Sequence, residues 1–176
     1  AAALAVASTL ALPAASVASS PLAGVNVAEA PLSGAVKVMV APLTAPDGSI
    51  VALHRTYLTQ SGLKADVPSV KKLTMTSGPL AGACIRLHDA KDGVIGIAEG
   101  IETALAAWLA SGVPTVAAYS ATNLAAWQWP AGVRRIVIFA DHDQAGAVAA
   151  DKLRQRARAA GLQCSVMTPS EPGADW

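Results

Sequence analysis

Three carboxylate side chains, Glu99, Asp141 and Asp143, stand directly after short apolar runs of the sequence. Glu99 follows the run at 94–98, and the two aspartates follow the run at 136–140. Three carboxylates held close together repel one another unless a cation neutralises them. Mg²⁺ is a hard ion that prefers oxygen ligands and keeps several waters for a substrate phosphate. The set is therefore typical of metal-assisted phosphoryl transfer.

The same acids also have a purely structural interpretation. Asp141 or Asp143 would serve equally well to cap the helix that follows them, and Glu99 would complement the dipole of its own following helix. Spacing alone leaves both interpretations open. Gly100 and Gly146 stand beside the acids, and glycine permits the close backbone approach that a phosphate site needs.

The region from residue 93 onward alternates between expected strands and expected helices. Strands are expected over 94–98, 115–118, 136–140 and 164–167. Helices are expected after residue 100, over 123–127 and over 145–160. This alternation predicts an α/β fold, with a mostly parallel sheet and helices on both faces. Ligands of such sheets bind beyond the carboxyl ends of the strands, so the three acids converge there if their strands are neighbours.

Particular side chains predict how these helices begin, end and face the core. Gly112 and Gly161 are expected just after the first and the last helix, and Ser120 or Thr122 is expected to cap the middle one. The apolar positions of the first helix, expected to form its buried face, are Ile101, Leu105, Trp108 and Leu109.

Residues 35–92 are expected to form a small β-rich subdomain in front of the α/β domain. Strands over 36–40 and 50–58, joined by a turn at 45–48, predict a β-hairpin. A short strand is expected over 83–87, before a turn at Asp92 and Gly93.

Residues 1–34 are rich in alanine, serine and proline, and the first 28 carry no charge. They are interpreted as a low-complexity leader or the start of a fragment of a longer protein. A secretory signal would need a basic start, and a membrane span would need a longer uninterrupted apolar run. We therefore expect a cytoplasmic protein with domains at 1–34, 35–92 and 93–176, and no membrane contact.

The net charge of +1 gives no global attraction to nucleic acid, so any such binding must rest on local patches. Cys84 and Cys164 lack metal-type spacing and are expected to be indifferent thiols. Lys152, two turns beyond the acids, is the expected phosphate contact of the last helix. The β-rich region has its own basic and aromatic residues, for which a solvated strand face is the alternative. These residues are His54, Arg55, Tyr57, Lys64, Lys71 and Lys72.

Three segments, 98–105, 118–124 and 139–146, together resemble the Toprim domain, and more narrowly that of phage- and plasmid-type primases and primase-helicases. Segments 53–58 and 173–176 also resemble this subgroup, so the resemblance covers roughly 36–176. It implies a Toprim-type, Rossmann-like fold in which Glu99, Asp141 and Asp143 bind Mg²⁺ or Mn²⁺. It also implies acid–base duty for Glu99. Bacterial replicative primases usually carry an aspartate where Thr103 stands. Glu102, one position earlier, is interpreted first as a solvated helix-start acid and second as a group supporting the site.

The activity implied by the resemblance is that of a DNA primase from a phage or plasmid, which joins ribonucleotides on a single-stranded DNA template. Arg55, Tyr57, Lys64 and Lys72 are then expected to contact template or nucleotide, together with Gly100, Gly146 and Lys152. A replicative helicase, fused or separate, is an expected partner. Two alternatives stay open, a catalytically silent Toprim module that binds nucleic acid and a Toprim-type nuclease.

Overall fold

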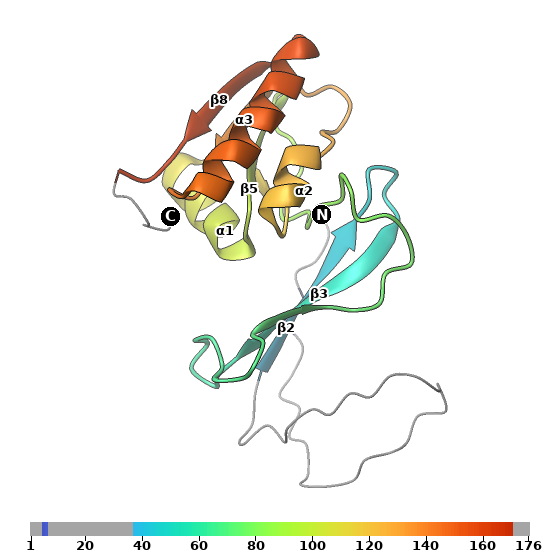
Figure 1. Ribbon diagram of the computed structural model, residues 1–176, viewed down its shortest axis with the longest axis vertical. Coiled ribbons are helices and arrows are strands. Elements are labelled where there is room, and N and C mark those ends of the chain that lie inside the picture. The colour runs from blue at the N-terminus through green and yellow to red at the C-terminus, as the bar shows by residue number, and fades with distance from the viewer. Residues whose placement is uncertain (1–4, 7–36, 171–176) are drawn as a thin grey trace, which may run out of the picture.

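The computed structural model describes residues 5–6 and 37–170 and contains two sheets, one antiparallel and one parallel (Figure 1). The predictions for the remaining parts of 1–34 and for 173–176 concern residues outside the described ranges. No helix of the described part is long and apolar enough to cross a membrane.

The antiparallel sheet has the strand order β1 (Ala5–Val6), β2 (Lys37–Thr44), β3 (Ile50–Leu58) and β4 (Lys71–Leu73). The predicted hairpin of β2 and β3 is confirmed, and β2 runs four residues past its expected end at Val40. Its turn is closed by Asp47, whose Oδ1 accepts hydrogen bonds from the backbone N–H and the hydroxyl of Ser49.

The two faces of this sheet have different surroundings, because successive side chains of a strand point to opposite faces. The face that carries Ala41, Leu43 and Ala52 packs against Ile101 and Phe139 of the C-terminal part. His54 and Thr56 lie on this same face, as does Lys71, whose position on β4 pairs with Thr56. The opposite face carries Arg55, Tyr57 and Lys72.

The second sheet is parallel throughout and has the order β6 (Thr115–Ala117), β5 (Val94–Ala98), β7 (Arg135–Phe139) and β8 (Gln163–Met167). All four strands expected from the apolar runs are present. Gly96 at the centre of β5 leaves room for its neighbours, since a Cβ there would lie 2.4 Å from Thr115 Oγ1 and 2.9 Å from Phe139 Cε2.

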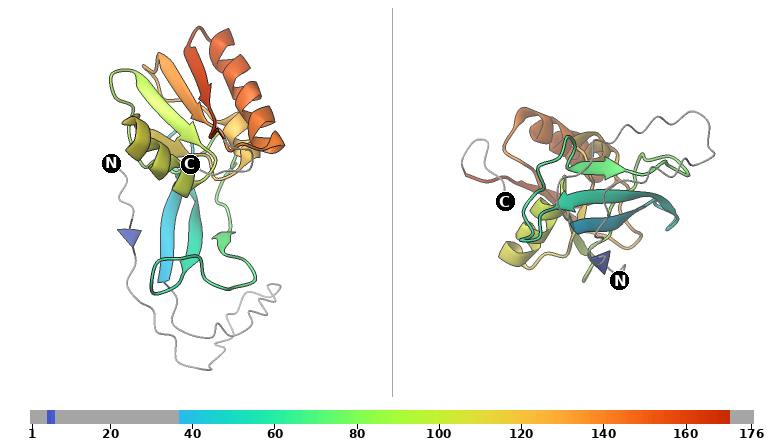
Figure 2. Two further views of the ribbon diagram at one scale, coloured as in Figure 1. Left: turned by 90° about the vertical axis from the view of Figure 1, so that its left-hand side faces the viewer. Right: turned by 90° about the horizontal axis from the view of Figure 1, so that it is seen from below.

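Helices cover both faces of the parallel sheet, as predicted (Figure 2). Helix α1 (Ile101–Ser111) packs on one face together with the antiparallel sheet. Helices α2 (Ala121–Ala126) and α3 (Gln144–Ala159) lie side by side on the other. Gly112 ends α1 in a left-handed conformation, and Ser120 caps α2 by accepting from the Asn123 N–H at 3.2 Å, so both expected caps are confirmed.

The expected buried face of α1 is partly wrong. Trp108 is 38% exposed and Leu109 is 76% exposed. The helix rests on the sheet through Ile101 and small side chains, which allow a close approach, whereas Trp108 and Leu109 are turned outward. Its buried residues are Ile101, Thr103, Ala104 and Ala107.

The strand expected over 83–87 is replaced by two isolated bridges. Cys84 pairs with Thr44 of β2, while Ile85 pairs with Ala117 of β6. No continuous ladder forms because the segment changes partner sheet from one residue to the next. Asn123 fixes this crossing, since its side chain accepts from the Gly82 N–H at 3.1 Å and donates to the carbonyls of Ala83 and Ala118.

Candidate functional site

The strands that precede the acids are neighbours. Ala98 of β5 stands opposite Phe139 of β7 in a parallel register, so Glu99 and Asp141 leave the sheet at the same edge. Asp143 follows two residues later, at the start of α3. The predicted convergence on the carboxyl edge of the sheet is thus present in the backbone.

The carboxylates influence one another electrostatically. Burial raises the pKa of Glu99, and the negative charges of Asp141 and Asp143 raise it further. The backbone N–H of Ala121 and the ammonium of Lys71 oppose this rise. The charged form of Glu99 is therefore disfavoured by burial and by the two neighbouring carboxylates.

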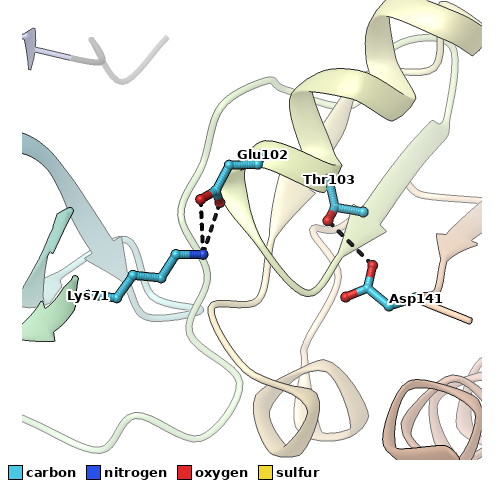
Figure 3. A network of polar contacts seen from close by, with 4 residues as sticks. All are labelled: Lys71, Glu102, Thr103 and Asp141. Atoms are coloured by element: carbon cyan, nitrogen blue, oxygen red, sulfur yellow. Dashed lines mark hydrogen bonds and ion pairs between the residues drawn. The ribbon is translucent and has the colours of Figure 1, made fainter. Parts of the chain in front are cut away.

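Asp143 caps helix α3, which is the role that the structural interpretation gives to an acid at a helix start. Its Oδ1 accepts the Gly146 N–H at 2.7 Å and caps α3, with the residue itself in an extended conformation. Asp141 has a different partner, because the Thr103 hydroxyl lies 3.4 Å from Asp141 Oδ1 (Figure 3). His142 turns away, with Nδ1 2.9 Å from the Pro169 carbonyl oxygen.

The two glycines beside the acids differ in what surrounds them. A Cβ at Gly146 would lie 2.8 Å from the Asp141 carbonyl oxygen, so this position requires glycine to close the acidic turn. A Cβ at Gly100 would meet nothing nearer than Glu102 Oε2 at 3.4 Å, which is ordinary contact. Gly146 is thus needed by the fold, whereas Gly100 is not.

The three carboxylates are ligands of the type that a divalent cation prefers, but they do not surround a common point. All three donors are carboxylates. Burial first, and then the charges of Asp141 and Asp143, raise the pKa of Glu99, and a cation would relieve the second of these effects. Within residues 5–6 and 37–170, however, no three His, Cys, Asp or Glu side chains lie close enough to hold one ion. The carboxylates would have to rotate toward an ion to bind it together.

An ion pair that the sequence did not predict lies beside this edge. Lys71 Nζ is 3.0 Å from Glu102 Oε1 and 3.1 Å from Oε2 (Figure 3). Burial alone would raise the pKa of Glu102. The N–H of Glu102 itself and the charges of Lys71 and Lys64 outweigh burial, so the pKa is lowered. Glu102 is an exposed acid at the start of α1, as expected, and its partner is a lysine of the antiparallel sheet. Local sequence patterns do not predict an ion pair between residues that are 31 positions apart.

The basic residues expected to bind nucleic acid do not form one surface. Arg55, Tyr57 and Lys72 lie together on the face of the antiparallel sheet that points away from α1, with Lys72 Nζ 5.7 Å from the Tyr57 ring centre. Lys64 is exposed in the loop that bridges back to Leu58. His54 does not belong to this surface, because it is 6% exposed on the opposite face.

Lys152 stands apart from all of these residues. It lines a groove between α2 and α3, on the face of the parallel sheet opposite α1. The groove begins next to the acidic edge, because Ala121 and Gln144 are among its lining residues.

Comparison with known proteins gives two matching family models. Residues 94–176 match the family model described as the Toprim domain, and residues 15–87 match one described as a domain of unknown function (DUF7146). No curated protein matches the chain.

Three solved structures share the fold. A DNA primase domain from Pseudomonas aeruginosa is 18% identical with a TM-score of 0.51, covering 80% of this chain and 44% of that one. A DnaG catalytic core is 15% identical with a TM-score of 0.51, covering 80% and 46%. The RNA polymerase domain of Mycobacterium tuberculosis primase DnaG is 18% identical with a TM-score of 0.50, covering 79% and 49%. The aligned region thus spans less than half the length of each of these structures.

Proposed function

Because residues 94–176 match the Toprim domain, we propose that this protein carries the metal-dependent nucleotidyl-transfer site of a DNA primase of the phage or plasmid type. It would join ribonucleotides on a single-stranded DNA template. The observation that carries the proposal is the convergence of Glu99, Asp141 and Asp143 on one sheet edge, where burial and then the charges of the two aspartates raise the pKa of Glu99. A cation bound there would relieve the repulsion between these charges.

Each acid has its own part in the proposed reaction. Mg²⁺ or Mn²⁺ bound at this edge would stabilise the charge that develops on the transferring phosphoryl group. Asp141 and Asp143 would hold the ion, with Thr103 orienting Asp141 through its hydroxyl. Glu99 would complete the ligand set and accept the proton of the attacking hydroxyl, a duty for which a raised pKa is suited.

The template would lie on the antiparallel sheet. Tyr57 offers a ring on which a base can stack, while Arg55 and Lys72 offer charges for phosphates on the same face. Lys64 would contact the template strand from the other side of the sheet, because it pairs with Leu58 and its charge acts on Glu102. Gly100 would let a phosphate approach the backbone at the start of α1. In this proposal a replicative helicase, fused or separate, is the partner that supplies the single strand.

Primer synthesis on a single-stranded template, with Mg²⁺ or Mn²⁺ titrated against a chelator, tests the proposal. Asp141→Asn and Glu99→Gln should each lower the rate by roughly a hundredfold or more. Asp151→Asn is the matched control, because Asp151 is an exposed acid of α3 that pairs with Arg154 at 2.7 Å, away from the edge. Full activity in Asp141→Asn, or in chelator, would refute the proposal.

A second candidate is the catalytically silent module. It is favoured by the cap that Asp143 provides and by the lack, in the described residues, of three acids assembled around one point. A silent module should bind DNA equally well with chelator and with Asp141→Asn, and should make no primers. Cleavage of the template in the same assay, with no synthesis, would instead identify the nuclease alternative.

A further inference from the structure

A groove of about 870 Å³ lies between α2 and α3, and none of the predicted catalytic groups lines it. This volume is within the range of about 300–1,000 Å³ that is typical of ligand sites. One wall comes from α3, where Gln144, Val148, Lys152 and Arg156 recur every four residues and so form a stripe along the helix.

The opposite wall is low and small, because α2 contributes Ala121, Ala125 and Ala126 to it. None of the described residues that line the groove is acidic, whereas two of them, Lys152 and Arg156, are basic. Arg156 is braced in place, with Nη1 2.8 Å from the Ala125 carbonyl oxygen and 2.9 Å from that of Trp127. The groove therefore combines a fixed positive charge, an exposed lysine and a shallow apolar floor.

One end of the groove meets the acidic edge. The Ala121 N–H faces the Glu99 carboxylate, and Gln144 directly follows Asp143. Lys152 lies nine residues beyond Asp143, which is about 13 Å along a helix that rises 1.5 Å per residue. A stacked strand rises roughly 3.4 Å per nucleotide, so this span equals three to four nucleotides.

We propose that the groove between α2 and α3 binds a single-stranded nucleic acid segment that leaves the acidic edge, with a phosphate on Lys152 three to four nucleotides away. The proposal rests on the proposed function, which puts the reacting phosphate at that edge. The span of about 13 Å separates the phosphate that reacts at the acids from the phosphate that Lys152 would contact. The small side chains of α2 leave room for sugars and bases, and the two cations match a phosphate backbone.

The test measures binding of fluorescent thymidine oligonucleotides of 2 and 12 nucleotides to the full chain by anisotropy, in chelator and over a range of salt. Lys152→Ala should weaken binding of the 12-mer by about fivefold at 0.1 M salt, and should lower the salt slope by about 0.7, the value for one phosphate contact. Binding of the dinucleotide should not change.

Arg158→Ala is the matched control, because Arg158 is an exposed cation of the same helix that does not line the groove. A second variant, Val148→Trp, fills the groove without changing its charge; Val148 is 49% exposed, so the fold should tolerate it. It should weaken the 12-mer and spare the dinucleotide.

Equal losses in Lys152→Ala and Arg158→Ala would overturn the proposal, since they would indicate a general effect of charge. Equal losses for both oligonucleotides would also overturn it, since Lys152 would then bind a phosphate that a short ligand supplies. Binding in chelator does not depend on catalysis. A failure here would therefore leave the metal-dependent activity of the acids standing, and a failure of Asp141→Asn to abolish synthesis would not alter these affinities.

Discussion

Lys71 of β4 and Glu102 of α1 form an ion pair that joins the antiparallel sheet to helix α1, with Nζ 3.0 Å from Oε1. The side chains are 41% and 48% exposed, so the pair should contribute only about 0–1 kcal/mol to stability. Its position matters more than its strength. The ammonium lies 4.0 Å from where a Cβ would stand at Gly100, and it lowers the pKa of Glu99 against the stronger effect of burial.

Lys71→Met should therefore tighten the binding of Mg²⁺, because it removes a cation from the field of the three acids. An effect of the order of 1 kcal/mol is expected for one charge at this range in a solvated site. Isothermal titration of Mg²⁺ measures it. Lys72→Met is the control, since Lys72 faces the other side of the sheet, and should leave the affinity unchanged. Weaker binding in Lys71→Met would show that the lysine supports the ion's site instead of opposing the ion.

Glu99→Gln should stabilise the metal-free protein at neutral pH. Because burial and then the charges of Asp141 and Asp143 raise the pKa of Glu99, the folded state holds this proton more tightly than the unfolded state. Stability is therefore lost as the pH rises from the ordinary value of 4.5 through the raised pKa. The variant lacks this loss, so its gain over the parent should be present at neutral pH and absent below 4.5. Urea unfolding in chelator, repeated over the pH range, measures the difference.

Glu102→Gln should show the opposite sign and so serves as the control. The pKa of Glu102 is lowered, which means that its charge stabilises the fold above the ordinary value of 4.5 and stops doing so as the pH falls. This variant should be less stable than the parent at neutral pH and equal to it in acid. A gain for Glu99→Gln of the same size at every pH would show that packing, not titration, is responsible.

The two duties of Asp143 can be separated by two substitutions. Asparagine caps helices about as well as aspartate, so Asp143→Asn should keep the stability of the metal-free protein. Asp143→Ala should lose about 0.5–2 kcal/mol, because the Gly146 N–H loses its acceptor. Both variants should lose most of the thermal stabilisation that Mg²⁺ gives the parent, about 1.4 kcal/mol at ten times Kd. Full Mg²⁺ stabilisation of Asp143→Asn would leave Asp143 with a capping role alone.

Gly146→Ala and Gly100→Ala should behave differently although both glycines flank the acids. The alanine at 146 puts a methyl group 2.8 Å from the Asp141 carbonyl oxygen and should cost about 1–3 kcal/mol, against the gain of about 1 kcal/mol that alanine normally gives a helix. The alanine at 100 makes only ordinary contacts and should change stability by less than about 0.5 kcal/mol. Urea unfolding compares the two. A fully stable Gly146→Ala would mean that the acidic turn relaxes easily.

Much of the fold could be predicted because its strands have simple sequence signals. The runs at 94–98 and 136–140 are apolar throughout, since these strands are buried on both faces, and β3 has the bounds that were expected for it. The strand expected over 36–40 is longer in the structure, because Pro42 pairs with Leu53 and β2 continues to Thr44. Proline is tolerated at sheet edges, and no rule of local sequence identifies such an edge.

The parts of the site that were missed depend on contacts between distant segments. Lys71 stood in the sequence as one of several basic residues, and only the packing of β4 beside α1 brings it to Glu102. The exposed Trp108 has the same origin, since helical spacing identifies an apolar face without showing that alanines let α1 approach the sheet more closely. The meeting of the two strand ends that carry the three acids was predictable from topology, whereas the binding of an ion by these acids stays a prediction.

The bridge between Ile85 and Ala117 has a consequence for any attempt to isolate the C-terminal domain. Ile85 exchanges two backbone hydrogen bonds with Ala117 of β6, the strand at the open border of the parallel sheet. A polypeptide that starts at residue 93 would expose that border and also lose the buried Cys84 and Ile85. Unprotected borders of this kind recruit strands from other molecules, so the shortened chain should self-associate while the longer one does not.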